Sequence, residues 1–369
     1  MSFRKTVSDI YRDDTHFDFA GMTNRLLAIA AGIVVVSLVI LGVRQLNLGI
    51  DFTGGTAWTV TGANKANTAD VRKIAEDAGL EAPQVTVLGQ DGVRVRSGSV
   101  SDETQAIVTA GLAEYAGVSA EDISVSDVGP TWGDEVTRQS RNAFVAFLIA
   151  VGIYIAFRFE PKMAVAAFAS LGHDLALTIG VYSLFQFEVS PATIVAVLTI
   201  LGYSLYDTVV VFDKIRTEEA NAGVNSRVTY DALVNSSVNG VLLRSLNTSI
   251  TSLLPVISML VIGSYVLGAV AIRDFGIALF VGMMAGTYSS LMVATPVLDW
   301  LKNREPRWQE AAKRAEVAGV GTTAAPGKKP AGGQDPASSA TAGTAATGSV
   351  PARGLTKKQQ ARQKAQKRK

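Results

Sequence analysis

The chain has 369 residues, of which 48% are hydrophobic, and its mean hydropathy is +0.26. This apolar excess is too high for an ordinary soluble protein and predicts membrane-spanning segments. The formal net charge of +2 is close to balance and gives no reason to expect a nucleic-acid partner. The absence of Cys excludes disulfides and thiolate chemistry, and two His residues alone cannot build a zinc site. We therefore expect no enzymatic activity, no catalytic residue, no metal and no cofactor.

Six apolar runs are long enough to cross a membrane. The first covers residues 26–46 and follows a charged leader without a small-residue cleavage site, so it is interpreted as a retained anchor. The other five lie within residues 142–302, and each is close to the ~20 residues that cross a ~30 Å hydrocarbon layer. These runs occupy about 142–158, 163–185, 192–212, 248–271 and 275–300.

Lys and Arg gather in the short connections on one side of these runs. Arg158 and Lys162 lie between the second and third runs, and Arg216 and Arg244 lie between the fourth and fifth. By the positive-inside rule, these connections and both termini are cytoplasmic. Residues 1–25 then form a cytoplasmic N-terminal segment, and residues 47–141 lie on the other side of the membrane.

The segment 47–141 has the pattern of a small α+β domain. We expect a strand over residues 50–60, a helix after Thr68, two strands at 85–88 and 93–95, a helix capped by Ser101 and a strand near 123–125. Gln90-Asp91-Gly92 is expected to form the hairpin turn. This β-α-β-β-α-β order is typical of a ferredoxin-like domain. The predicted fold class is an α-helical membrane protein with six transmembrane helices and one extracytoplasmic ferredoxin-like domain.

Residues 303–369 are predicted to be a disordered, basic, cytoplasmic tail. Residues 318–354 are rich in Ala, Gly, Thr, Ser and Pro and contain too little apolar surface to offset the entropy of ordering. The basic run 357–369 favours an electrostatic tether to anionic lipid. A contact with ribosomes or RNA is the less favoured alternative.

Asp207 and Arg244 form the predicted proton-coupling site. Asp207 lies inside the fourth apolar run, where an ionisable side chain is costly unless it is paired or wetted. Arg244 precedes the fifth run, at a similar depth if the two runs are antiparallel. Protonation of Asp207 would weaken such a pair and create a two-state element. The alternative is a structural hydrogen bond or an interfacial position for Asp207.

Other polar residues inside the apolar runs are candidates for a proton relay or for structural hydrogen bonds. His173 and Asp174 lie in the middle of the third run, and the two roles are equally favoured for them. The remaining candidates are Tyr203, Ser204, Thr248 and Thr251. Gly282 and Gly286 in the sixth run predict close helix packing.

Several motifs together resemble the SecF members of the SecD/SecF protein-export family. They occur in the family's order over residues 1–305 and include Ser245, where the family often has Thr. The motifs are Gly49-Ile50-Asp51-Phe52-Thr53-Gly54-Gly55-Thr56, Val128-Gly129-Pro130 with Gly133 and Glu135, His173-Asp174, Gly202-Tyr203-Ser204, Asp207-Thr208-Val209-Val210-Val211-Phe212-Asp213, Arg244-Ser245-Leu246-Asn247-Thr248-Ser249 and Gly286-Thr287-Tyr288-Ser289-Ser290.

The resemblance implies a fold of the resistance-nodulation-division type in the bacterial cytoplasmic (inner) membrane. It implies SecD as the obligate partner half, association with the SecYEG channel and with YajC, and unfolded exported polypeptides as substrates. Because six spans are half of the usual transporter repeat, a separate partner half is expected. The resemblance also marks Asp207 and Arg244 as the proton-linked pair, and Asp51, Gly54 and Gly55 as a motif outside the first span.

Three functional hypotheses follow. The leading one is an accessory subunit of the Sec translocase that uses the proton-motive force to promote late translocation and release of exported proteins on the outer face. The second is a half-transporter for small amphiphiles, which requires an apolar pocket in the outer domain. The third is a passive scaffold for membrane-protein insertion, in which Asp207 and Arg244 form a static pair.

Overall fold

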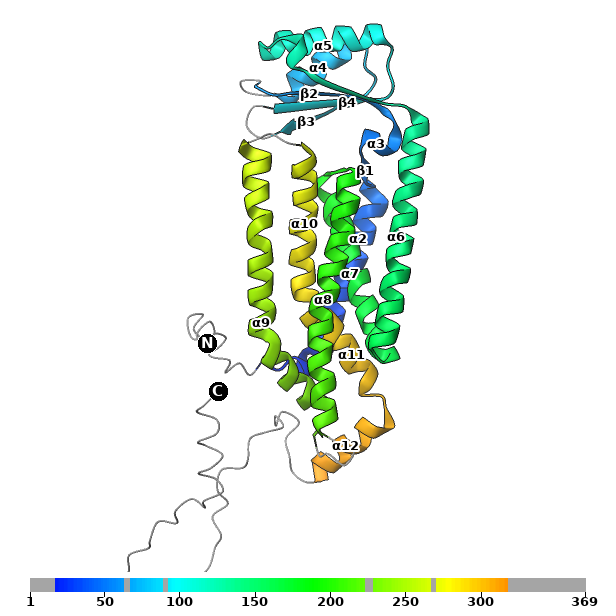
Figure 1. Ribbon diagram of the computed structural model, residues 1–369, viewed down its shortest axis with the longest axis vertical. Coiled ribbons are helices and arrows are strands. Elements are labelled where there is room, and N and C mark those ends of the chain that lie inside the picture. Colours follow the sequence, from blue (N-terminus) through cyan, green and yellow to red (C-terminus); the bar gives the residue numbers. More distant parts are fainter. Residues whose placement is uncertain (1–16, 63–66, 89–91, 223–227, 267–269, 318–369) are drawn as a thin grey trace, which may run out of the picture. The chain divides into compact units, whose positions relative to one another are not determined.

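The computed structural model of the chain describes residues 17–62, 67–88, 92–222, 228–266 and 270–317. Within these ranges, six helices are long and apolar enough to cross a membrane. A small β-sheet lies at one end of these helices, and we call this end the sheet end. The helix α12 lies at the opposite end (Figure 1).

The six predicted spans are present as helices, although their ends differ from those of the apolar runs. The first span joins η1 (Ala20–Met22) to α2 (Thr23–Arg44), and the next three are α6 (Pro130–Arg158), α7 (Pro161–Phe185) and α8 (Pro191–Ala222). The fifth joins α9 (Tyr230–Met259) to the π-helical η3 (Leu260–Val266), and the sixth joins α10 (Val270–Ser289), the π-helical η4 (Ser290–Ala294) and α11 (Thr295–Lys302). Helix α6 begins at Pro130, so it already includes the last residues of the predicted extracytoplasmic segment 47–141. Hydropathy marks only the apolar part of a helix.

A four-stranded antiparallel sheet occupies the sheet end. Its strands are β2 (Gly55–Val60), β3 (Gln84–Leu88), β4 (Gly92–Ser97) and β5 (Ser124–Val128), in the order β3-β4-β2-β5. The helices α4 (Thr68–Asp77) and α5 (Asp102–Ala116) connect them, so the predicted sequence of strands and helices is present. The core includes Trp58, Val71 and Leu112, and the Trp58 indole N–H donates to Thr109 Oγ1 at 3.1 Å.

Local details of this domain differ from the predictions in two places. Residues 50–53 form the short helix α3 (Ile50–Thr53) rather than the start of a strand, because the chain turns through positive φ at Gly54. The cap of α4 is Asn67, not Thr68, while Ser101 caps α5 as predicted. The predicted turn residues Gln90 and Asp91 lie outside the described residues.

Buried charges attach the four-stranded sheet to the segments that connect the spans, and a separate two-stranded pairing joins two of these segments. Strand β1 (Asn47–Leu48) pairs in parallel with β6 (Glu188–Val189), which links the end of α2 to the start of α8. On β4, the Arg96 guanidinium lies 3.3 Å from the Glu188 carboxylate and donates to the Leu48 carbonyl at 3.1 Å. Burial lowers the pKa of Arg96, and the Glu188 charge opposes this effect. This docking had no signal in the sequence.

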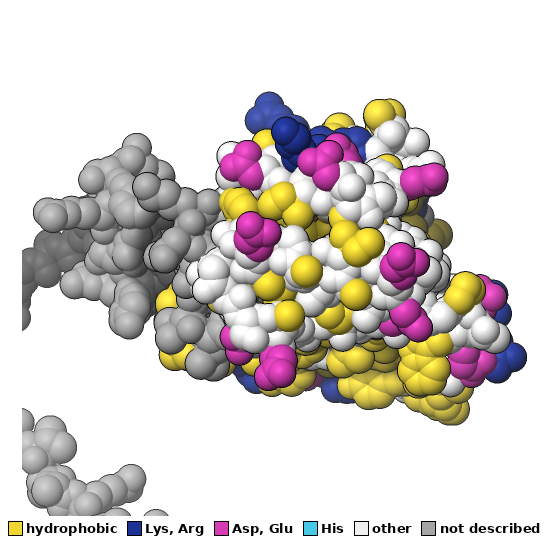
Figure 2. All heavy atoms as spheres, turned by 90° about the horizontal axis from the view of Figure 1, so that it is seen from above, with side chains coloured by type: hydrophobic (Ala, Val, Ile, Leu, Met, Phe, Trp, Pro, Cys, Tyr) yellow, Lys and Arg dark blue, Asp and Glu magenta, His cyan; other side chains and the backbone are white. Residues whose placement is uncertain are grey.

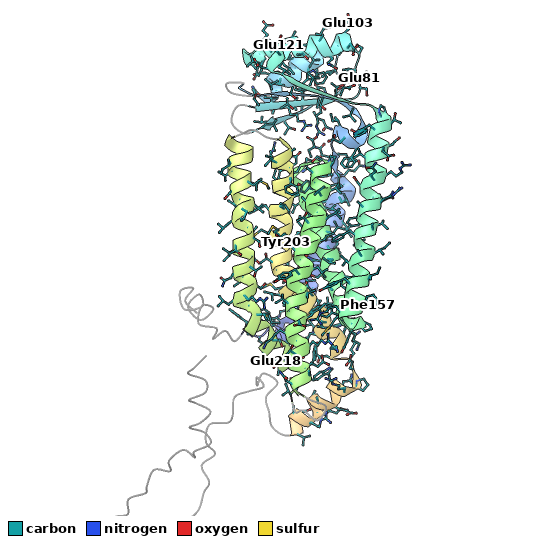
Figure 3. The ribbon with its side chains drawn as sticks, in the orientation of Figure 1. Glu81, Glu103, Glu121, Phe157, Tyr203 and Glu218 are labelled. Carbon is teal, nitrogen blue, oxygen red and sulfur yellow. The ribbon has the colours of Figure 1, made fainter. Side chains whose placement is uncertain are left out.

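The opposite face of the domain is acidic. Seen from the sheet end, carboxylates surround scattered apolar side chains, whereas Lys and Arg gather at one edge (Figure 2). Glu81, Glu103 and Glu121 lie on this side, far from Tyr203, which is about midway along the spans (Figure 3). The domain therefore presents carboxylates outward and the guanidinium groups of Arg94 and Arg96 toward Glu188.

At the opposite end, residues predicted to be disordered are folded. Helix α12 (Pro306–Val317) buries Trp308 to 3% exposure, and its indole lies 4.9 Å from the Tyr230 ring, between centroids. Lys302, itself buried, forms ion pairs with Glu160 and Glu219, and its hydrogen bond holds the pKa of Glu160 below the ordinary value. The prediction of disorder from residue 303 is therefore wrong through 317, because the indole supplies an apolar contact that low-complexity composition lacks. Residues 318–369 lie outside the described part.

Replacement of Gly55 should disrupt the start of the sheet. Gly55 has φ of 125°, and a Cβ atom there would lie 2.3 Å from the Ser97 carbonyl oxygen. We expect Gly55→Ala to cost about 1–3 kcal/mol and to lower the midpoint of thermal unfolding in detergent. Gly98→Ala is the control, because its Cβ would meet nothing within 4 Å. Equal melting of the two variants would contradict the close approach.

Loss of the Trp308 side chain should loosen α12. We expect Trp308→Ala to cost about 3–5 kcal/mol, since it removes a buried ring and leaves a cavity. Trp300, which is 41% exposed, provides the matched control. Protease cleavage near residue 306, followed by mass spectrometry, should increase in Trp308→Ala and not in Trp300→Ala. Unchanged cleavage in both would mean that α12 does not depend on this contact.

Candidate functional site

Asp207 lies where three spans meet. Its α8 helix presents the carboxylate toward α9 and η4, and Oδ2 accepts hydrogen bonds from Ser245 Oγ at 2.7 Å and from Ser290 Oγ. Ser245 comes from α9 and Ser290 from η4. Two hydroxyl donors from two other helices therefore satisfy a charge that would otherwise be costly inside a membrane.

Small residues allow this approach of the helices. A Cβ on Gly282 would lie 2.3 Å from Ile200 Cδ1, and a Cβ on Gly286 would lie 3.0 Å from Ser204 Cβ. The predicted glycine stripe of the sixth span thus packs against α8. Ser290 follows at the start of the π-helical segment η4, and π-helical turns are frequent at functional sites because they rotate the side chains that follow.

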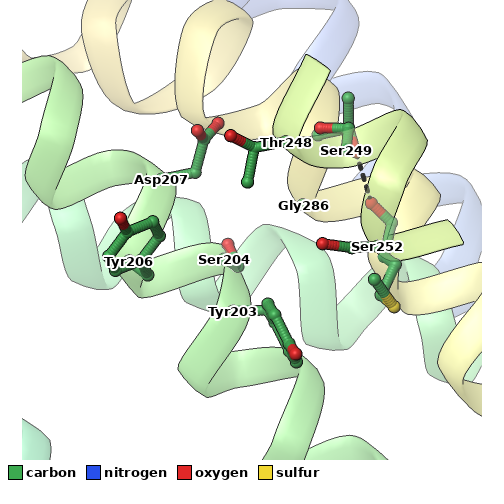
Figure 4. Close-up of a pocket in the computed structure, with 10 residues that line it drawn as sticks. Tyr203, Ser204, Tyr206, Asp207, Thr248, Ser249, Ser252 and Gly286 are labelled. Carbon is green, nitrogen blue, oxygen red and sulfur yellow. Dashed lines mark hydrogen bonds between the residues drawn. The ribbon is translucent and has the colours of Figure 1, made fainter. Parts of the chain in front are cut away.

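A small cavity opens beside Asp207. It has a volume of about 30 Å³, which is enough for one water molecule. Its wall includes Ser204, Asp207, Thr248, Ser249 and Gly286, and Figure 4 shows the Asp207 carboxylate beside the Thr248 hydroxyl group. A water in this cavity would have carboxylate and hydroxyl partners, as a proton path requires.

His173 and Asp174 form a second polar cluster behind Asp207. Both are buried, at 3% and 0% exposure. Asp174 Oδ2 accepts from Ser204 Oγ, and Asp174 Oδ1 lies 3.4 Å from His173 Nδ1. The Tyr288 hydroxyl lies 2.9 Å from His173 Nε2, with the two rings edge to face. Tyr288, His173, Asp174 and Ser204 are therefore connected by consecutive polar contacts.

The cluster around Asp207 and the cluster of His173 and Asp174 are adjacent along α8 and along the sixth span. Ser204 precedes Asp207 by about one turn of α8, and Tyr288 shortly precedes Ser290 on the sixth span. Ser204 and Asp207 also line the same cavity. The arrangement provides two carboxylates separated by hydroxyl groups and a water-sized space. Carboxylates, hydroxyl groups and an imidazole are the groups that proton-transfer sites use.

The predicted ion pair of Asp207 and Arg244 is not formed. Among the described residues, no ion pair joins them, and Arg244 is exposed on α9. Its neighbour Ser245 faces Asp207 instead, because consecutive side chains on a helix point about 100° apart. Arg244 lies close in sequence to the site, but it is exposed.

The remaining predicted residues divide between the site and its surroundings. Tyr203 lines the cavity and is half exposed, and Thr248 lines it while its hydroxyl group donates to the Arg244 carbonyl at 2.9 Å. Thr251 is exposed and bonds only to carbonyls of its own helix, so it is not part of the site. Sequence reasoning assigned no role to Tyr288, although it lies within the quoted Gly286-Thr287-Tyr288-Ser289-Ser290 motif.

Asp51, Gly54 and Gly55 lie at the sheet end, away from Asp207. A Cβ on Gly54 would lie 3.2 Å from the Val128 carbonyl oxygen, and one on Gly133 would lie 2.7 Å from that of Phe52. These glycines bring the backbone after the first span against the start of α6. Asp51 is half-buried in the first turn of α3. The motif therefore has a packing role in this structure.

Within the described ranges, no group of three or more His, Asp or Glu side chains is placed to hold a metal ion. The chemistry that the site offers is proton exchange and hydrogen bonding among carboxylates, hydroxyl groups and one imidazole.

Two segments of the chain match known families. Residues 107–304 match "Protein export membrane protein SecD/SecF, C-terminal", and residues 39–56 match "SecD/SecF GG Motif". The chain is 38% identical over 320 residues to the protein translocase subunit SecF of Streptomyces coelicolor, covering 85% of this chain and 86% of that protein. It is 36% identical to the SecF subunit of Mycobacterium leprae, covering 82% and 68%.

Longer relatives are also similar. The protein translocase subunit SecDF of Thermus thermophilus is 35% identical over 81% of this chain, which spans 40% of that protein. The crystal structure of SecDF from Thermus superposes with a TM-score of 0.71 and 33% identity, covering 79% of this chain and 39% of that one. The match thus extends over about two fifths of the longer proteins.

Removal of the Ser204 hydroxyl should destabilise the bundle. Asp174 is fully buried, and Ser204→Ala leaves its Oδ2 without this donor, which should cost about 1–3 kcal/mol. Thr251→Ala serves as the control, because it removes an exposed hydroxyl from the neighbouring α9. The thermal unfolding midpoint in detergent should fall only for Ser204→Ala. A similar midpoint for both variants would show that Asp174 does not need the Ser204 hydroxyl.

Proposed function

The chain belongs to the SecD/SecF family of protein export membrane proteins, and from this membership we propose that it is a proton-driven accessory subunit of a Sec protein translocase. In this proposal it uses the proton-motive force to promote late translocation of exported proteins and their release on the outer face of the membrane. It acts without enzymatic chemistry of its own.

The observation that carries this proposal is the geometry around Asp207. One carboxylate oxygen accepts hydrogen bonds from two helices and lies beside a cavity large enough for water. A protonated carboxyl group has less acceptor capacity and gains a donor, so uptake of a proton changes which hydroxyl contacts are favourable. Spans α8, α9 and the end of the sixth span then have two preferred arrangements.

The energy available fits a change of conformation. One elementary charge that crosses a potential of 100 mV releases about 2.3 kcal/mol. This amount is comparable with the loss of one or two hydrogen bonds at Asp207, each worth roughly 1.5–3 kcal/mol when one partner is charged. Proton binding from one side and release to the other can therefore bias the two arrangements.

The proposed topology places the sheet end outside a bacterial cytoplasmic membrane and both termini in the cytoplasm. The positions of basic residues support it: Arg158, Lys162 and Arg216 all lie at the end opposite to the sheet. The four-stranded domain is then an extracytoplasmic ferredoxin-like domain. Its acidic outer face (Figure 2) would meet exported polypeptides in the unfolded state.

SecD is the proposed partner half. Relatives named SecDF carry the matching region as part of a longer chain, which supports a partner of the SecD type. Tyr203 and Tyr206 are about half exposed beside the cavity, and Arg244 is exposed nearby on α9. An unpaired guanidinium near the membrane is costly, so a partner half that covers this face would lower its energy. Association with SecYEG and YajC belongs to the same proposal.

Two rival functions have less support. A half-transporter for amphiphiles needs an apolar pocket in the sheet domain. In that domain, a groove of about 500 Å³ lies between α4 and α5, and its wall includes the charged residues Asp77 and Glu114. A passive scaffold based on a static Asp207–Arg244 pair lacks that pair in the structure.

Release of a secreted reporter tests the proposal. Inverted membrane vesicles or cells that carry only Asp207→Asn should lose the gradient-dependent part of reporter release, because the amide cannot exchange the proton. Asp213→Asn is the matched control: Asp213 lies on the same helix but pairs with Arg158 and is half exposed. In the Asp213→Asn variant, release of the reporter should still respond to the proton gradient.

The outcome separates the functions. Loss of the gradient response in Asp207→Asn, with normal insertion and co-purification of the partner, supports proton coupling through Asp207. A response like that of the parent protein would overturn it and favour the scaffold. Loss of the response in both variants would indicate a general effect of charge on α8 rather than a coupling site.

A further inference from the structure

A second, larger cavity opens between α6, α7 and α8 at the sheet end of the spans. Its volume is about 320 Å³, roughly ten times that of the cavity beside Asp207. Its apolar wall is formed by Leu46, Phe144, Leu175, Ile179, Ile194 and Val197.

Three of the hydroxyl groups in the wall are already engaged elsewhere. Thr178 Oγ1 donates to the Asp174 carbonyl at 2.8 Å, and the Tyr182 hydroxyl donates to the Asp274 carbonyl at 3.1 Å. Thr193 Oγ1 accepts from the Ser190 backbone N–H at 3.1 Å. Apart from Ser140 and Arg141, the polar side chains of the wall are therefore satisfied within the protein. Apolar cavities exclude water and take apolar ligands.

The cavity lies where the apolar run of α6 begins, which is where hydropathy puts the boundary between headgroups and hydrocarbon. Ser140 and Arg141 form its rim on α6, and the apolar run of that helix begins at Ala143. Farther along α6, Val151 and Ile155 are buried against the bundle, and Gly133 contacts the backbone at Phe52. Helix α6 is thus held near its two ends, and the cavity separates it from α7 and α8 between them.

Arg141 lacks a protein partner. It is exposed, and in the described part of the chain it forms no ion pair or side-chain hydrogen bond. Arg138, one turn earlier on α6, is instead paired with Glu135. A cation at the headgroup level beside an apolar cavity complements a ligand with a negative head and a hydrocarbon tail.

We propose that this cavity binds an anionic phospholipid. One acyl chain fills the space between α6 and α7, and the phosphate group pairs with the Arg141 guanidinium. The bound lipid replaces the missing contact between α6 and the bundle. Because α6 follows strand β5 after the single residue Gly129, the lipid also fixes the direction in which α6 leaves the sheet.

Native mass spectrometry of the full chain tests the site. The protein is purified with any subunit that accompanies it, delipidated, and titrated with phosphatidylglycerol or with phosphatidylcholine of the same acyl chains. We expect the parent protein to retain phosphatidylglycerol. Binding should be about fivefold weaker in Arg141→Gln, since one contact between a basic side chain and an anionic lipid contributes ~1 kcal/mol. Arg138→Gln removes the same charge from the same helix and should bind as the parent protein does.

A second variant tests the cavity itself. Val197→Phe with Ile179→Phe fills the space with apolar rings and should abolish retention of both lipids while the protein remains folded. Equal binding of the two lipids, equal effects of Arg141→Gln and Arg138→Gln, or unchanged retention in the filled variant would each overturn the proposal. The proposal would also be overturned if a crosslinker at position 141 captured a partner subunit that displaces the lipid, since the cavity would then be a protein interface.

Discussion

The structure depends on the cost of a polar group that lacks a partner inside a membrane. Asp207 and Asp174 each lie within a span, and each takes hydroxyl donors from a neighbouring helix: Ser245 and Ser290 for Asp207, and Ser204 for Asp174. These bonds require α8, α9 and the sixth span to approach closely, which Gly282 and Gly286 permit. In the proposed function, the same hydroxyl contacts that stabilise the bundle make its packing sensitive to the protonation of a carboxyl group.

Ion pairs also connect the ends of the spans to the segments that lie next to them. At the sheet end, Arg96 and Glu188 hold β4 against the segment that leads into α8, and α8 carries Asp207. At the opposite end, Lys302 joins the α6–α7 connection to the far end of α8 through Glu160 and Glu219. Helix α8 is thus fixed by ion pairs at both ends and by Asp207 between them.

Arg244 and Arg141 show how unpaired cations indicate what the chain lacks. Both are exposed and unpaired among the described residues, but their surroundings differ. Arg244 lies one helical turn from Thr248, which lines the cavity beside Asp207 and two exposed tyrosines, and in the proposed function a protein partner covers this face. Arg141 lies at the rim of an apolar cavity, which suits a hydrocarbon chain with an anionic head. The chemistry of the adjacent wall distinguishes the two occupants.

The sequence by itself determined the six spans, the order of strands and helices near the sheet and the cap at Ser101, because these depend on local hydropathy and side-chain hydrogen bonding. The cost of an isolated charge also singled out Asp207, and its role in proton coupling stays a prediction. The sequence did not determine that Ser245 rather than Arg244 faces Asp207, nor that Tyr288 meets His173. The docking of Arg96 on Glu188 and of Trp308 on Tyr230 had no local signal either. Only the tertiary structure decided these contacts, because they join residues far apart in the chain. Consecutive side chains on a helix also point about 100° apart, so a residue that faces a partner can be adjacent to one that does not.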